Sequence, residues 1–199
     1  MEMKIEIKGL KETIKFLDDL SKSQLPYATA RALTMTAKDV QTEIIRTLPN
    51  RFILRSNWYQ QSNALGFRVK SATKNNLSAI VGTAADWMPL QEEGGTKIPR
   101  GKMLALPSLN VRRNKREKIV KSQRPRALLA SGKAFIKGDV IYLRYGGKKN
   151  KHLRLMYTLQ PKADVHAALH FLETGKKIID QKFNQNFGTA MNDALRTMR

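Results

Sequence analysis

Two adjacent carboxylates, Glu92 and Glu93, are the residues of this sequence that first suggest acid–base chemistry. General acid–base catalysis requires groups that converge on one reacting atom. Neighbouring residues of an extended segment point to opposite sides, so this pair is poorly placed to converge. No nucleophile with a partner base lies nearby in the sequence, and a structural role for the two glutamates is therefore favoured.

Three histidines are the next candidates. His166 and His170 are four residues apart, so on a helix they would share one face and could hold a metal ion. The residue after His166 is Ala167, whereas the metalloprotease helix motif has glutamate there. His152 is distant in sequence, and two histidines alone do not complete a zinc site. A solvated or packed helix face is favoured, and no metal or other cofactor is expected.

The motif "GGKKNK" at residues 146–151 contains the residue types of a phosphate-binding loop. A P-loop, however, places glycine, four residues and then Gly-Lys-Ser/Thr between a strand and a helix. Here the motif connects two expected strands. Nucleotide hydrolysis is therefore rejected.

Positive charge is the strongest signal in the sequence. The chain has 37 Lys and Arg against 16 Asp and Glu, a formal net charge of +21. Residues 101–150 contain fourteen of the basic residues and only two acidic ones, so more than half of the excess lies in one quarter of the chain. Such a surface attracts polyanions or acidic proteins. The candidate contact residues are Arg112, Arg113, Lys115, Arg116, Lys118, Lys121, Arg124 and Arg126.

Two partners for this basic segment are left open. Contact with a phosphate backbone would be independent of base sequence and sensitive to salt, and contact with an acidic protein is the alternative. The segment has no aromatic residue for stacking bases and no zinc-finger or RNA-recognition signature. Because residues 112–133 are rich in charge and poor in aromatics, this is the one region where disorder is expected.

Periodicity predicts the elements that must position these groups. Residues 3–8 alternate apolar and charged side chains, which is typical of a half-buried strand, and a short helix with Leu10, Ile14 and Leu17 follows. A long helix is predicted from Pro26, with Pro49 and Asn50 ending it. Its apolar stripe is Ala30, Leu33, Ala37, Val40, Ile44 and Leu48.

Alternation in "GFRVKSAT", "NLSAIVGTA", "DVIYLRYG" and "HLRLMYTL" predicts four further strands. Residues 163–187 are predicted to be helical, with residues 188–199 as a tail that frays or docks on a partner. The fold class is α+β: one domain over residues 1–199, with an antiparallel sheet packed against the long helix of the N-terminal half and the C-terminal helix. Residues 109–137 are expected to form a basic, extended loop insertion in it. No apolar run of about 18 residues exists, so no membrane association is expected.

Three motifs in order, "VGTAADW", "EEGGT" and "LALPS", resemble the tail-completion or head–tail joining proteins of long-tailed bacteriophages. The lambda-type minor tail protein Z and its relatives are the nearest group. The resemblance covers residues 5–110, and the final helix is consistent with it. Two departures from that pattern are the doubled Gly94-Gly95 and the long basic insertion after Ser108.

The resemblance implies a structural virion protein without enzymatic activity. It would be assembled in the host cytoplasm and form a ring, hexameric in the family, at the head-proximal end of the tail. The implied partners are the tail tube or tail terminator, the head connector or neck protein, and the end of the packaged DNA. The alternative is a standalone nucleic-acid-binding protein that contacts phosphates through residues 112–133.

Within such a ring, residues 86–108 would form a loop that contacts the next subunit. Gly94 and Gly95 would allow backbone angles that other residues resist, and the two glutamates would pair with basic residues of the neighbour. Trp87 and Met88 would hold the base of the loop in apolar surroundings. The expected subunit-contact residues are Trp87, Met88, Glu92, Glu93, Gly94, Gly95 and Thr96.

Overall fold

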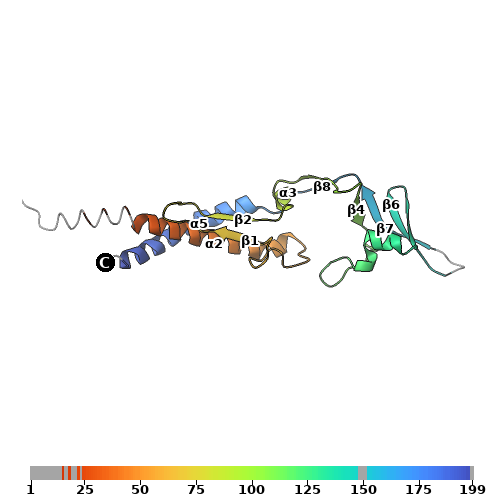
Figure 1. Ribbon diagram of the computed structural model, residues 1–199, viewed down its shortest axis with the longest axis horizontal. Helices are drawn as coiled ribbons and strands as arrows, with labels where there is room; N and C mark the ends of the chain where they lie inside the picture. The colour runs from red at the N-terminus through yellow and green to blue at the C-terminus, as the bar shows by residue number, and fades with distance from the viewer. Residues whose placement is uncertain (1–14, 16–17, 19–21, 23, 148–151, 198–199) are drawn as a thin grey trace, which may run out of the picture. The chain divides into compact units, whose positions relative to one another are not determined.

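A computed structural model describes residues 15, 18, 22, 24–147 and 152–197. The chain divides into two compact units by its internal contacts, and Figure 1 labels their elements. Unit 1 comprises Met1–Thr47, Trp58–Ala85 and His170–Arg199, and unit 2 comprises Leu48–Asn57 and Asp86–Leu169. The strand expected over residues 3–8 lies outside the described residues, as do Leu10, Ile14 and Leu17 of the short helix.

The long helix is confirmed as α2 (Leu25–Arg51). Its apolar stripe is buried, apart from the half-buried Leu33. The prediction that Pro49 and Asn50 end the helix is wrong, because Pro49 lies inside its last turn. A proline there removes only one backbone donor, and Phe52 N still donates to Leu48 O at 2.9 Å.

In unit 1, α2 packs against α5 (Phe171–Arg196) through small side chains. The four alanines of this contact, which we call the alanine seam, are 0% exposed: Ala28, Ala32, Ala190 and Ala194. Small residues let two helix backbones approach closely, so substitutions that add volume at the seam must separate the helices or strain their side chains.

Polar contacts set the register of α2 against α5. Asn186 Nδ2 donates to Thr36 Oγ1 at 3.1 Å and to Asp39 Oδ2 at 2.8 Å. Towards the other end of the pair, Arg31 and Asp193 form an ion pair at 2.7 Å. Low numbers on one helix therefore face high numbers on the other, so the two helices run antiparallel.

Both ends of the C-terminal helix differ from the prediction. Residues Ala163–Val165 form a strand, β8, and α5 begins only at Phe171. At the other end α5 continues to Arg196, so residues 188–196 are helical and do not form a frayed tail. Two of the small residues of this stretch, Ala190 and Ala194, belong to the alanine seam.

A two-stranded antiparallel sheet completes unit 1. The strands β1 (Phe67–Lys70) and β2 (Ile80–Thr83) lie in two of the predicted strand segments. The side-chain amide of Gln41 on α2 donates to Phe67 O at 2.6 Å. Ala72 N donates to Thr34 Oγ1, also on α2, at 3.1 Å. Two hydrogen bonds thus attach this hairpin to the long helix.

Unit 2 contains a four-stranded antiparallel sheet with the order β4-β7-β6-β5. Its strands are β4 (Leu104–Pro107), β5 (Ala134–Lys137), β6 (Val140–Tyr145) and β7 (His152–Gln160). The last two confirm the strands predicted in "DVIYLRYG" and "HLRLMYTL". The two segments pair in antiparallel register, with a β-bulge between Ile141 and Tyr142.

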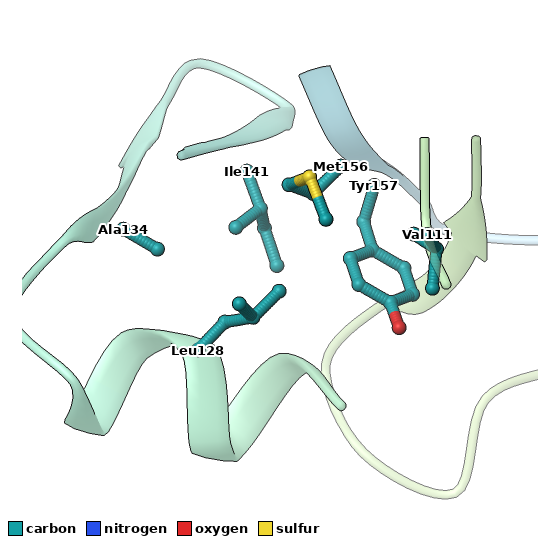
Figure 2. Close-up of a cluster of buried hydrophobic side chains, with 6 residues drawn as sticks. All are labelled: Val111, Leu128, Ala134, Ile141, Met156 and Tyr157. Atoms are coloured by element: carbon teal, nitrogen blue, oxygen red, sulfur yellow. The ribbon is translucent and has the colours of Figure 1, made fainter. Parts of the chain in front are cut away.

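One face of this sheet carries the core of unit 2. Figure 2 shows Leu128 of α4 (Pro125–Ala130) beneath the buried side chains of the sheet. The buried residues are Val111, Leu128, Ala134, Ile141, Met156 and Tyr157. Burial raises the pKa of the Tyr157 phenol, and its hydroxyl donates to Gln123 O at 2.8 Å.

The disorder expected for residues 112–133 is wrong. This segment contains a short 3-10 helix, η2 (Lys121–Gln123), and then α4. Leu128 within it is 4% exposed and Ile119 packs against the same core. A few apolar side chains, widely spaced among the charges, are sufficient to order the segment because they bury against the sheet.

The fold class is α+β, as predicted, with a long helix in the N-terminal half, antiparallel strands and a C-terminal helix. The strands form three sheets where one was expected, because β3 (Gly95–Lys97) pairs only with β8, and β1 only with β2. That the chain folds as one domain stays a prediction, since contacts do not measure whether the two units unfold together. In the described part of the chain, no helix has the length and apolar character needed to cross a membrane.

Candidate functional site

Residues 86–108 were expected to be a loop and instead contain a helix and two strands. The helix α3 (Met88–Glu93) carries a proline in its first turn, where the missing N–H is not needed. Strand β3 follows and pairs with β8 in antiparallel register, forming a ribbon of three residues on each strand. Thr96 Oγ1 donates to Asp164 Oδ1 at 3.2 Å across this ribbon. We call the pair the β3–β8 ribbon.

The turn from α3 into the ribbon explains the two glycines. Gly94 has φ +74° and Gly95 has φ +127°, both in the region that favours glycine. A Cβ on Gly94 would lie 3.1 Å from both Ala167 N and Val165 O. The expectation that these glycines adopt unusual angles is confirmed. The close approach, however, is to a segment of the same chain.

Replacing Gly94 by alanine should therefore destabilise unit 2 by about 1–3 kcal/mol, because the left-handed angle and the close backbone contact are both strained. Chemical denaturation of the purified protein measures this. Gly101→Ala is the matched control, since no atom lies within 4 Å of a Cβ there. Equal unfolding midpoints for Gly94→Ala and the control would contradict the explanation.

Apolar side chains are exposed around the ribbon. Met88 is buried at 5% exposure, whereas Trp87 is 40% exposed. Ile98 and Met103 are 76% and 36% exposed, and neither was singled out from the sequence. The sequence contained a pattern that could have identified them. Apolar residues in a segment rich in glycine and proline have few neighbours to cover them, so they are expected to be exposed. Trp87 and Ile98 line one hollow with Lys97 of β3, which makes this pair a candidate contact surface.

Glu92 and Glu93 do not form an acid–base pair. Both lie in the last turn of α3, where successive side chains point about 100° apart. Glu92 is half-buried and Glu93 is exposed. Gly94 follows Glu93 directly and leads into β3, so the two glutamates are next to the β3–β8 ribbon in sequence.

The basic residues of the segment 112–126 lie on an ordered turn and the helices that follow. Asn114 closes the turn, accepting hydrogen bonds at its Oδ1 from Arg116 N and Lys118 N, each at 3.0 Å. Arg113 is half-buried and donates to Glu117 O at 3.2 Å. The other seven candidate residues are exposed: Arg112, Lys115, Arg116, Lys118, Lys121, Arg124 and Arg126.

Charge is divided unequally between the two units. Unit 2 contains 21 Lys and Arg against six Asp and Glu, whereas unit 1 contains 16 against ten. Unit 2 therefore carries most of the positive excess on fewer than half of the residues. Its field would attract polyanions and acidic surfaces and would repel a second copy of the same surface.

The histidines are not arranged as a metal site. His166 lies between β8 and α5, and His170 precedes the first turn of α5 with φ +50°. The prediction that the two share a helix face is wrong, because pairing with β3 makes residues 163–165 a strand. His152 lies on β7, with its ring 5.4 Å from that of Tyr145. The described residues include no group of three or more His, Asp or Glu able to hold a metal ion.

The glycines of "GGKKNK" follow strand β6, and residues 148–151 lie outside the described residues. The next described element is strand β7, so the motif connects two strands as expected. This is not the strand-to-helix junction that a P-loop requires.

Comparison with known proteins supplies one match. A protein-family model described as "Prophage minor tail protein Z (GPZ)" matches residues 7–199. The matched range includes every described element of both units. Searches among curated proteins and among solved structures gave no match.

Proposed function

This chain belongs to the prophage minor tail protein Z family, and from that membership we propose that it forms a ring at the head-proximal end of a phage tail and joins the tail to the head. The family supports a structural role in a phage tail. The ring, its position and the joining step are the proposal. No bond-making chemistry is assigned to any side chain.

The observation that carries the proposal is the concentration of charge in unit 2, with 21 basic and six acidic residues. Seven of the eight candidate contact residues are exposed on an ordered segment. In a ring of six copies, these surfaces would be repeated around one axis. Such an array would attract either the end of the packaged DNA or an acidic neighbouring ring, and would speed their encounter.

The β3–β8 ribbon is proposed as the contact between neighbouring subunits. An isolated two-stranded ribbon is at best marginally stable, and here each strand has only three residues. In the described chain both outer edges of this ribbon lack a pairing strand, and such edges accept a further strand. Trp87 and Ile98, which line one hollow with Lys97 of β3, supply exposed apolar area beside it.

Deleting the gene from an inducible prophage tests the joining step. Induced cells should yield filled heads and full-length tails that remain separate, and a plasmid copy should restore joined particles. Immunogold labelling of isolated tails should place the protein at the end that meets the head. A normal infectious titre without the gene, or label at the opposite tail tip, would contradict the proposal.

The alternative of a standalone nucleic-acid-binding protein is supported by the same exposed basic residues. It predicts a protein absent from purified tails that binds duplex DNA with a steep salt dependence. Quantifying the protein in purified particles, beside a salt titration of DNA binding, separates the two functions.

A further inference from the structure

The four-stranded sheet of unit 2 has a second face, whose residues do not belong to the buried core of the unit. Side chains alternate along each strand, so residues one step from the buried Ala134 and Ile141 point to the other side. Past the β-bulge, Tyr142 pairs with Leu155 and Arg144 pairs with Leu153, so these two leucines of β7 lie on that side as well. On β4, Leu104 and Leu106 pair with Gln160 and Thr158, which alternate with the buried Tyr157. We call this side the open face. Its apolar residues are Leu104, Leu106, Phe135, Val140, Tyr142, Leu153 and Leu155.

Exposure distinguishes the two faces. On the core face Ile141 and Tyr157 are each 1% exposed. On the edge strand β5, Ile136 of the core face is 52% exposed. On the open face Leu153 is 56% exposed and Leu106 is 37% exposed, and the other five apolar residues are half-buried. An apolar area of this extent, spread over all four strands, is typical of a partner-binding surface.

The positive charge of the open face and of unit 2 as a whole favours an acidic partner. The four strands contain no Asp or Glu, and Lys137 and Arg144 lie on the open face beside its apolar residues. A second copy of this face would bring together two units that each carry 21 basic and six acidic residues. Like-charge repulsion on that scale opposes self-association.

The arrangement of the aromatic residues favours protein over single-stranded nucleic acid. Bases bind to sheet surfaces by stacking on open aromatic rings. Here Phe135 stacks with Tyr142, with ring centroids 5.9 Å apart, and the Arg144 guanidinium lies 4.2 Å from the Phe135 centroid. The other apolar residues of the face are aliphatic and offer no ring on which a base could stack.

We propose that the open face binds an acidic protein of the virion, one whose apolar contact area is bordered by carboxylates. Leu106, Leu153 and Leu155 would be covered by the apolar centre of the partner. Arg144, held over Phe135, would pair with a carboxylate at the border while losing little side-chain freedom. The proposal rests on the proposed tail role for where the partner is found, but it uses a different face from the basic segment.

Site-specific photocrosslinking tests this in intact particles. Benzoylphenylalanine is placed at position 153, and at position 109 as the control, because Leu109 is fully exposed and outside the sheet. Light should join position 153 to an acidic peptide of another virion protein, and position 109 should not label that peptide. An adduct to DNA, to a second copy or to unit 1, or no adduct at position 153, would overturn the proposal.

A pair of leucine substitutions gives an independent measurement. Leu153→Glu should lower the copies retained per particle by about tenfold, since it places a charge in the apolar contact, while Leu109→Glu leaves retention unchanged. Both sites are exposed, so both variants should keep the thermal midpoint of the parent protein. Equal retention of the two variants would refute the open-face contact. If the parent protein itself is absent from particles, the proposed tail function fails as well.

Discussion

Replacing Ala190 by leucine is expected to cost about 3 kcal/mol of the free energy of unfolding of unit 1, and to separate α5 from α2 locally. Ala190 is 0% exposed and packs in the alanine seam with Ala28, Ala32 and Ala194. The added isobutyl group finds no space between two backbones in close contact. The hydrogen bonds from Asn186 to Thr36 and Asp39, one turn away, should be strained too.

Hydrogen exchange of the α2 and α5 amides, together with urea denaturation, measures this loss. Thr189→Leu is the matched control, since Thr189 is exposed in the same helix one residue earlier. That variant should stay within about 0.5 kcal/mol of the parent protein. Similar stabilities for the two variants would mean that α2 and α5 do not pack through the alanine seam.

The turn closed by Asn114, with Arg112, Lys115, Arg116 and Lys118, is called the basic turn here, and reversing its charge should have the largest effect on particle assembly. Changing Arg112, Lys115, Arg116 and Lys118 to glutamate leaves unit 2 with 17 basic and ten acidic residues. All four side chains are exposed, so the fold should be retained. Arg113 is left unchanged because it donates to Glu117 O within the turn. Infectious titre should fall, and tails without heads should accumulate.

A control with the same change in charge separates local from overall electrostatics. Lys70, Lys74, Lys177 and Lys182 are exposed in unit 1, and their change to glutamate should leave the titre close to that of the parent. If the basic turn contacts DNA, its variant should also flatten the salt dependence of duplex binding by about one unit per lost phosphate contact. Normal titres for the basic-turn variant would remove this segment from the joining step.

Elements whose periodic pattern is long were predictable from the sequence. The stripe of α2 extends over several turns, and the alternation in β6 and β7 identified two paired strands. The α+β class followed from the order of these elements. Charge, too, is a property of composition, and its concentration in residues 101–150 needed no coordinates. The motifs around Trp87, Gly94 and Pro107 also indicated the family that the match over residues 7–199 supports.

The secondary structure of short segments depends on the strands with which they pair. The spacing of Val165, Leu169 and Leu172 suits a helix, yet Val165 pairs with Gly95 and α5 starts later. Ladder hydrogen bonds with a distant strand outweigh local helix propensity, which is only a few tenths of a kcal/mol per residue for most residue types. The metal-site alternative for His166 and His170 was lost with that helix.

The tertiary structure alone also shows that the basic segment is ordered. It likewise shows that the strands form three sheets. The charges of residues 112–133 suggested disorder, but Leu128 and the neighbouring Val111 bury against Ile141 and Tyr157 of the sheet. A sequence specifies which side chains are apolar, whereas burial depends on which surface reaches them. That surface is formed by strands distant in sequence, so the local sequence pattern of the segment cannot predict it.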